Sequence, residues 1–341
     1  MAWAAHSKNT PLTLTEFQLK TWNEDDVDID ITDSGICRSD IHTIDSSWGD
    51  SDYPVVPGHE FVGTISRVGK NVSKFKVGDR VGLGPLCYSC GECSSCSEDV
   101  PNCCKSGFYG TYNCRLPNGE KTYGGYTTKW RGNMNFVVKI PDNVTSENAC
   151  TMLCAGVTTY APLKRWNTDA TSSVGVMGLG GLGHFGVLFA KALGAKVTVL
   201  SHSEVKRQVA FELGADDYVN TSDPKQMDKL RGSLTHLLCT GMGKNFKWET
   251  ILPLIKANGV FINLALPTFD LPAIPVFQFT TSQIAIASSF VGSPKEAEEM
   301  FQLVSRKKIK AWYQTYPMHE VNRAIEDFKA GKPRFRYVLK N

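Results

Sequence analysis

The sequence predicts an α/β protein with two domains, one rich in short β-strands and one a doubly wound parallel sheet. Three observations support this prediction. The 341 residues amount to about two domains of ordinary size, and 42% of them are hydrophobic, enough to build a proper core. Roughly the first 150 residues contain β-segments between glycine turns, whereas strands alternate with helices from residue 173 onward.

The first part of the chain contains the β-segments. Residues 27–31 alternate apolar and acidic side chains, as a half-exposed strand does. Residues 61–68 and 76–82 form two more β-segments, separated by a glycine-containing turn.

The second part begins with an apolar strand at residues 173–177, a glycine-rich turn, and a helix at 181–193 that Gly194 can terminate. Strands that alternate with helices imply right-handed βαβ units and a parallel sheet. The remaining expected elements are strands at 196–200, 217–219, 234–239 and 259–266 and a helix at 204–213. In the last 50 residues, which could return to the first domain, we expect helices at 295–304 and 319–330 and a strand at 335–339.

Composition and charge argue against several classes of function. Lys and Arg total 37 against 34 for Asp and Glu, with no long run of one sign, so neither nucleic acid nor a membrane is favoured as a partner. No uninterrupted apolar stretch reaches the length of a membrane span, and the first ten residues lack the pattern of a secretory signal. We therefore expect a cytoplasmic protein.

The turn at residues 178–183 fits the dinucleotide-binding pattern G-x-G-x-x-G. It follows an apolar strand and opens a helix, which is the context that gives the pattern meaning. Gly178 would allow the tight turn, Gly180 the approach of a pyrophosphate, and Gly183 close packing of helix on strand. The predicted phosphate-binding residues are Gly178, Leu179, Gly180, Gly181, Leu182 and Gly183.

The end of the next strand predicts NADP rather than NAD. An NAD site places an Asp or Glu there to accept hydrogen bonds from the ribose 2′-hydroxyl. This chain has Ser201 and Ser203 instead, followed by Lys206 and Arg207, and these hydroxyls and cations suit a 2′-phosphate. Glu204 is the one acid nearby, at a point where a helix begins and acids are favoured.

Four closely spaced cysteines predict a closed metal site. Six of the eleven cysteines fall within residues 87–104, and Cys90, Cys93, Cys96 and Cys104 can close a tetrahedron around Zn²⁺. Such a site is structural because it leaves no open position. Cys87 and Cys103 offer alternative spacings, and an iron–sulfur cluster or disulfides are the chemical rivals.

Three dispersed residues form a second candidate site. Cys37, His59 and Cys154 each have an ordinary interpretation as buried residues, but each stands in an unusual local sequence beside a cofactor fold. Two cysteines and one histidine with a vacant fourth position are the ligands of a catalytic zinc.

The sequence resembles the zinc-containing medium-chain alcohol dehydrogenases, and within them the NADP-dependent cinnamyl alcohol dehydrogenase branch with its broad-range aldehyde reductases. The resemblance covers nearly the whole chain. It rests on the four-cysteine segment and on GICRSDIH (35–42), YPVVPGHEFVG (53–63), CAGVTTYAPL (154–163), GLGGLGHFG (178–186), ELGADDYV (212–219) and SFVGSPKEAEEM (289–300).

The resemblance implies a split, GroES-like catalytic domain at residues 1–153 and 292–341 around a Rossmann NADP-binding domain at 154–291. It implies two zinc ions per chain, with Cys37, His59 and Cys154 on the catalytic one, where Glu60 can replace water. Asp40 would hold the histidine ligand. The cofactor contacts implied in addition are Arg38 at the phosphates and Thr158, Thr240, Ser289, Phe290 and Val291 around the nicotinamide.

The implied reaction is mainly the reduction of aldehydes to primary alcohols, with zinc as Lewis acid and NADPH as hydride donor. The proton would travel through Ser39 and His42. Trp48, Tyr109 and Phe290 would form an aromatic pocket for cinnamyl-type and medium aliphatic substrates.

Two alternatives remain at this point. A zinc polyol or secondary-alcohol dehydrogenase is disfavoured by Cys154, because those relatives often carry Glu as that ligand. A non-catalytic zinc or nucleotide-binding protein is disfavoured by the intact Ser39 and His42 pair. The stretch 271–286, where relatives pair their sheets, predicts a homodimer.

Overall fold

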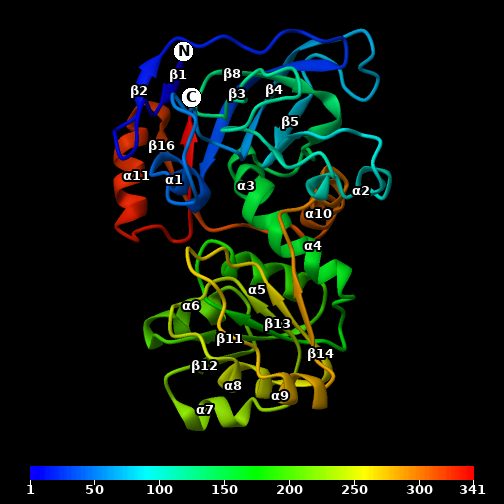
Figure 1. The fold of residues 1–341 in the computed structure, drawn as a ribbon, viewed down its shortest axis with the longest axis vertical. Coiled ribbons are helices and arrows are strands. Elements are labelled where there is room, and N and C mark those ends of the chain that lie inside the picture. The colour runs from blue at the N-terminus through cyan, green and yellow to red at the C-terminus, as the bar shows by residue number, and fades with distance from the viewer. The chain divides into compact units, whose positions relative to one another are not determined.

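The computed structural model describes all residues, 1–341, as two compact units. The first comprises Met1–Val157 and Val291–Asn341, and the second comprises Thr158–Phe290. Both chain ends lie in the first unit (Figure 1). None of the helices combines the length and the apolar character needed to cross a membrane.

The first unit is built on a seven-stranded sheet. Its strands pair in the order β16-β17-β3-β4-β5-β9, and β8 pairs with β3. All pairs are antiparallel except β16 with β17, so the C-terminal strand lies beside the long strand β3 (Figure 1). The strands are β3 (Asp26–Ile36), β4 (Phe61–Val68), β5 (Arg80–Leu83), β8 (Lys129–Asn133), β9 (Val137–Lys139), β16 (Tyr313–Pro317) and β17 (Arg336–Lys340).

Two small two-stranded sheets and a set of helices complete the first unit. The sheets are β1 (Ala2–Ala4) with β2 (Thr13–Thr15) and β6 (Leu86–Tyr88) with β7 (Tyr109–Gly110). The α-helices are α1 (Arg38–Ile44), α2 (Ser94–Ser97), α3 (Ser146–Thr151), α10 (Pro294–Lys307) and α11 (Val321–Lys329). A π-helical turn (Met152–Gly156) follows α3, and 3₁₀ turns occupy Pro101–Cys103, Met134–Phe136 and Met318–Glu320.

Two apolar cores stabilise the first unit. One surrounds Tyr126 and Tyr337 and includes the apolar side of α11, and the other surrounds Phe61 and Trp130. Burial of these large side chains supplies the main driving force for folding of the unit.

The second unit contains a six-stranded parallel sheet in the order β12-β11-β10-β13-β14-β15. Numbered along the chain, this is the doubly wound order 3-2-1-4-5-6, which reverses direction between β10 and β13 and creates a ligand crevice at that point. The strands are β10 (Ser173–Met177), β11 (Lys196–Ser201), β12 (Asp217–Asn220), β13 (Leu234–Cys239), β14 (Ile255–Asn263) and β15 (Ala285–Ser288).

The connecting helices of the second unit are short. They are α4 (Val157–Arg165, whose first residue belongs to the first unit), α5 (Gly183–Ala192), α6 (Arg207–Glu212), α7 (Pro224–Lys229), α8 (Trp248–Ile251) and α9 (Val276–Thr281), with 3₁₀ turns at Glu204–Lys206 and Leu252–Leu254. One core of the unit surrounds Trp248 and Phe261, whose rings meet edge to face.

The predicted fold class, a β-rich GroES-like part with a Rossmann sheet, is confirmed, and most expected elements occur. The largest difference lies in β14, which begins at Ile255 rather than 259 and ends at Asn263 rather than 266. Pairing with β13 starts at Ile255 and is interrupted by a bulge, a feature that an apolar pattern does not reveal. The segment 76–82 is also mostly turn, and its strand β5 begins at Arg80.

Candidate active site

Three side chains from separate segments of the first unit converge to form the first candidate metal site. Cys37 lies between β3 and α1, His59 lies two residues before the start of β4, and Cys154 lies in the π-helical turn. The His59 Nε2 atom is 3.1 Å from the Cys154 Sγ atom, and the two sulfur atoms are 3.8 Å apart. All three residues are buried, and their ligand atoms lie within 4.8 Å of one another.

This geometry fits one tetrahedral zinc ion. Sulfur atoms bonded to zinc at about 2.3 Å with tetrahedral angles are about 3.8 Å apart, the distance that separates Cys37 and Cys154. Three protein ligands leave the fourth position open, as catalytic zinc requires. The π-helical turn that carries Cys154 is a rare conformation that occurs often at functional sites.

Asp40 holds two of these ligands in place. Its carboxylate accepts hydrogen bonds from the Cys37 backbone N–H (2.7 Å) and the Gly58 backbone N–H (3.1 Å). Its Oδ1 atom is also 2.9 Å from the His59 Nδ1 atom. Because Nδ1 donates to this carboxylate, Nε2 carries the lone pair that a metal needs. Asp40 can do this because it is the third residue of α1 and fully buried.

Electrostatics prepare Cys37 to act as a thiolate. A hydrogen bond from the Cys154 thiol holds the pKa of Cys37 well below its usual range, although burial opposes this shift. The thiolate is the form that binds metal.

Tyr112 is a site residue that the sequence analysis missed. Its hydroxyl oxygen is 3.0 Å from the same His59 Nδ1 atom, and the two rings are 5.5 Å apart between centroids. Burial, followed by the charge of Asp40, raises the pKa of Tyr112 well above its usual range, so the hydroxyl stays protonated. A single tyrosine in a turn-rich segment gives no periodic signal that would have marked it.

Glu60 forms an ion pair rather than joining the three ligand atoms. Its Oε1 atom pairs with the Arg336 guanidinium, and both side chains are buried. Burial raises the pKa of Glu60 to about 8 despite this pairing. The Glu60 Oε2 atom has no hydrogen-bond partner.

Ser39 and His42 lie three residues apart on α1 and therefore on the same side of the helix. The Ser39 hydroxyl lies 3.7 Å from the Cys37 sulfur atom. The His42 ring stacks on Trp48 at 4.3 Å between centroids, and its Nδ1 atom is 2.6 Å from the Ser47 hydroxyl. Burial, and next the charge of Arg38, lower the pKa of His42.

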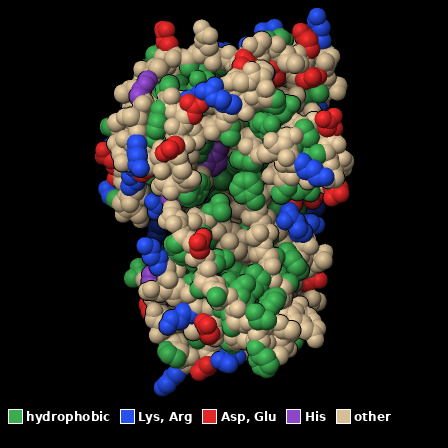
Figure 2. Space-filling view, in the orientation of Figure 1, with side chains coloured by type: hydrophobic (Ala, Val, Ile, Leu, Met, Phe, Trp, Pro, Cys, Tyr) green, Lys and Arg blue, Asp and Glu red, His purple; other side chains and the backbone are tan.

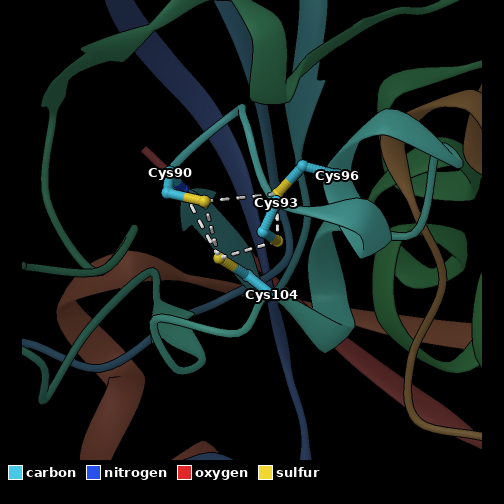
Figure 3. Close-up of side chains that lie close together, drawn as sticks. All are labelled: Cys90, Cys93, Cys96 and Cys104. Carbon is cyan, nitrogen blue, oxygen red and sulfur yellow. Dashed lines mark hydrogen bonds between the residues drawn. The ribbon is translucent and has the colours of Figure 1, made fainter.

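The second metal site is the four-cysteine cluster between β6 and β7 (Figure 3). Four sulfur–sulfur distances within the cluster are 3.5–4.0 Å, which again match one tetrahedral ion. They are far longer than the bond of a disulfide. A hydrogen bond from the Lys105 backbone N–H to Cys93 lowers the pKa of that thiol to about 6. The four candidate ligands are Cys90, Cys93, Cys96 and Cys104.

The two surplus cysteines do not belong to this cluster. Cys87 is buried, and its thiol donates to the Gly110 carbonyl oxygen at 3.3 Å. Burial raises the pKa of Cys87, which makes it a poor thiolate ligand. Cys103 is exposed and lies outside the group of sulfur atoms.

In the second unit, the glycine turn lies between β10 and α5, at the reversal point of the sheet. Gly178 has φ +91°, and a Cβ atom on Gly183 would lie 1.9 Å from the Gly178 carbonyl oxygen, so only glycine fits there. A Cβ on Gly180 would meet no protein atom within 4 Å. That open space and the adjacent start of α5 fit a pyrophosphate.

The side chains after β11 differ in how free they are to contact a 2′-phosphate. Lys206 donates a hydrogen bond to the Leu179 carbonyl oxygen (2.8 Å), which places the amine at the glycine turn. Ser201 is buried and accepts a hydrogen bond from the Ser203 backbone N–H. Arg207 is already engaged by both carboxylate oxygens of Glu204, at 2.6 and 3.2 Å.

Two hydroxyl groups expected near the nicotinamide are buried without a partner: Thr158 Oγ1 and Ser289 Oγ. A buried, unsatisfied hydroxyl is costly unless a ligand completes it, so both fit the expected role. Thr240 instead donates to the Gly178 carbonyl oxygen at 2.8 Å and supports the glycine turn. Val291 adopts φ +46°, which is rare for a β-branched residue.

The expected pocket residues are aromatic and partly exposed. Trp48 is 45% exposed and Phe290 is 40% exposed. Tyr109 packs its ring edge to face on Tyr88 at 5.0 Å. The Arg38 guanidinium lies over the Phe328 ring.

Comparison with known families identifies both parts of the chain. Residues 23–142 match the alcohol dehydrogenase GroES-like domain, and residues 181–306 match the zinc-binding dehydrogenase family. NADP-dependent alcohol dehydrogenase C 1 from Mycolicibacterium smegmatis is 40% identical over 339 residues, which cover 99% of this chain and 97% of that protein.

Solved structures give the same result. A cinnamyl alcohol dehydrogenase from Sorghum bicolor matches with TM-score 0.94 and 35% identity, covering 99% of this chain and 96% of that one. A Helicobacter pylori enzyme of the same name, complexed with NADP(H), matches with TM-score 0.90 and 34% identity, covering 99% and 97%. Together with the two metal-ligand groups, these matches show that the chain belongs to the zinc-dependent medium-chain alcohol dehydrogenases, in the branch of the cinnamyl alcohol dehydrogenases.

Proposed function

We propose that the protein reduces aromatic and medium aliphatic aldehydes to primary alcohols with NADPH. The observation that carries this proposal is the buried group of Cys37, His59 and Cys154, whose distances fit zinc with one open position. When bound there, zinc supplies Lewis-acid stabilisation of the negative charge that develops on the substrate oxygen. The relatives named above are alcohol and cinnamyl alcohol dehydrogenases, which agrees with this chemistry.

NADP is the proposed cofactor because of the residues after β11. Lys206 is held at the glycine turn, and Ser201 and Ser203 offer hydroxyl groups beside it. Arg207 contributes less than the sequence suggests, since Glu204 neutralises it. The M. smegmatis relative is named NADP-dependent, and the H. pylori structure contains NADP(H), which supports the choice.

Proton delivery is assigned to Ser39 and His42. Ser47 occupies the Nδ1 atom of His42, which leaves Nε2 to exchange a proton with the substrate side. The lowered pKa of His42, caused by burial and by Arg38, keeps the ring neutral near pH 7, so that it can accept and release a proton.

Domain roles and substrate preference follow. Residues 1–153 and 292–341 form the proposed catalytic domain, and residues 154–291 the NADP-binding domain.

The proposed substrate contacts are the aromatic side chains of Trp48, Tyr109 and Phe290. Flat apolar aldehydes gain free energy from burial against aromatic rings, at roughly 25 cal/mol per Å². Hydroxylated sugars would leave polar groups unpaired there.

We also propose a cytoplasmic homodimer. Figure 2 shows hydrophobic side chains gathered on the visible face of the second unit, in the region of β14 and α9. Exposed apolar residues in or next to the 271–286 stretch include Leu266, Leu271, Ile274, Val276 and Phe277. An exposed apolar patch of this kind is typical of an association surface. Two thiolate metal sites and no disulfide suit a reducing compartment.

The test is an assay of a panel of aldehydes with NADPH and with NADH. The reaction is monitored through the loss of absorbance of the reduced nicotinamide. Cinnamaldehyde, benzaldehyde and butanal should be reduced, with NADPH preferred and with activity lost after treatment with o-phenanthroline. Cys87→Ser is the matched control for Cys154→Ser, because each removes one buried thiol of the same unit. Oxidation of a polyol with no aldehyde reduction would refute the proposal.

A further inference from the structure

A hydroxyl group next to the first metal site has no role in the mechanism described above. Tyr112 lies in the loop after β7, buried, with its hydroxyl oxygen 3.0 Å from the His59 Nδ1 atom. The Asp40 Oδ1 atom is 2.9 Å from the same nitrogen. The histidine nitrogen that faces away from the thiols is therefore contacted by two oxygen atoms rather than one.

The donors and acceptors can all be satisfied. His59 directs Nε2 toward the thiols, so its single ring proton resides on Nδ1. Asp40 also accepts from the Cys37 and Gly58 backbone N–H groups and thus binds three partners. Tyr112 can accept part of the Nδ1–H bond, and its own proton stays on the hydroxyl because burial and the negative charge of Asp40 raise the pKa of Tyr112.

We propose that Tyr112 is a positioning residue for the zinc ligand His59. Its hydroxyl and the Asp40 carboxylate form a two-oxygen cradle that fixes both the tautomer and the rotation of the imidazole ring. Asp40 alone is one contact point about which the ring can pivot. A second oxygen on the same nitrogen, with the Tyr112 ring packed at 5.5 Å, restricts that pivot and keeps Nε2 directed at the metal position.

Helix α1 supports the Asp40 side of this arrangement. The Asp40 carboxylate, which contacts His59 Nδ1, also accepts a hydrogen bond of 2.7 Å from the Cys37 backbone N–H. One carboxylate therefore connects the positions of the two ligands Cys37 and His59.

The inference rests on the proposed occupation of this site by zinc, and the test is Tyr112→Phe in the zinc-loaded enzyme. The substitution removes one oxygen atom and keeps the ring. Tyr316→Phe is the matched control, because it removes a tyrosine–aspartate hydrogen bond of 2.8 Å, to Asp327, within the same unit. Zinc release to a coloured chelator separates the two sites, and the four-cysteine site serves as an internal reference.

We expect release from the catalytic site to become roughly 10-fold faster in Tyr112→Phe, with the four-cysteine phase unchanged. In enzyme carrying cobalt(II) at the catalytic site, the visible absorption bands should shift, because rotation of one ligand changes the coordination geometry. Tyr316→Phe should change neither. Release rates and cobalt spectra of Tyr112→Phe that match the control would overturn the proposal, even if both variants lose thermal stability equally.

A second measurement, on the unmodified zinc-loaded enzyme, covers the case in which Tyr112→Phe does not fold. In NMR spectra the His59 Nδ1 proton should be protected from exchange with water and should show a nuclear Overhauser effect to the Tyr112 ring protons. A rapidly exchanging proton without that effect would refute the cradle. These readouts do not involve NADPH or aldehyde, so the positioning role stands or falls separately from the proposed reaction.

Discussion

The imidazole ring of His42 stacks on the indole of Trp48, with 4.3 Å between centroids and 24° between planes. From the sequence, His42 is expected on the proton route and Trp48 in the substrate pocket. Their contact joins the two tasks, because a change at Trp48 also removes a surface that orients His42.

Trp48→Ala should therefore affect two kinetic parameters. The KM for cinnamaldehyde should rise roughly 5- to 30-fold, since about 1 to 2 kcal/mol of contact between the substrate and the indole is lost. The KM for butanal should rise less. The kcat should fall for both aldehydes because His42 loses its stacking partner. Steady-state kinetics with Trp312→Ala as a control would check this. An unchanged kcat for butanal would show that the stacking does not orient His42.

Cofactor preference should depend on Lys206. Lys206→Ala should lower kcat/KM for NADPH roughly 10- to 100-fold, because one charge-assisted hydrogen bond to the 2′-phosphate is lost. The kcat/KM for NADH should stay nearly unchanged. Arg207→Ala is the matched control and should change the ratio much less, because Glu204 already pairs with that guanidinium.

Ser201→Asp should shift the preference toward NADH. A carboxylate there would repel the 2′-phosphate and accept hydrogen bonds from the 2′-hydroxyl. The measurement is the ratio of kcat/KM for the two cofactors before and after the change. Equal values for both cofactors in the unmodified enzyme would contradict the NADP assignment itself.

The two metal sites should respond differently to the loss of one cysteine. Cys154→Ser should abolish turnover and keep the fold, whereas Cys93→Ser should lower the melting temperature by several degrees, since structural zinc contributes to folding. Elemental analysis should give about two zinc ions per chain before substitution and about one after either change. Iron in the four-cysteine site would refute its assignment.

The pH dependence of kcat should change when Arg38 is replaced. Burial and the Arg38 charge lower the pKa of His42, because both disfavour the imidazolium form. Arg38→Met removes one of these causes, so the pKa of His42 should rise. In alcohol oxidation, where neutral His42 accepts the proton, the acidic limb of the kcat profile should therefore move to higher pH. Arg323→Met, which removes an exposed cation of the same unit, should leave the profile in place. Measurement at saturating NADP+ separates this effect from weaker cofactor binding.

The sequence by itself determined the class of this protein. Strand–helix alternation and the glycine turn predicted the Rossmann sheet, and short-range spacing predicted the four-cysteine site, because both patterns lie within contiguous segments of the chain. The dispersed residues Cys37, His59 and Cys154 were selected as a candidate set from their unusual local sequences, and the resemblance to a family then assigned them to the catalytic zinc. Their spacing of 22 and 95 residues does not by itself indicate that they meet.

Only the tertiary structure decided which side chains are free to contact a metal, cofactor or substrate and which are engaged by other protein groups. It brought Tyr112 to the nitrogen that Asp40 also contacts, placed Trp48 on His42, and paired Arg207 with Glu204. It also separated Cys87 and Cys103 from the four cysteines beside them in sequence. The physical reason is that hydrogen bonds, ion pairs and ring contacts act over 3 to 5 Å in space, and the register of strands and the path of loops set those distances.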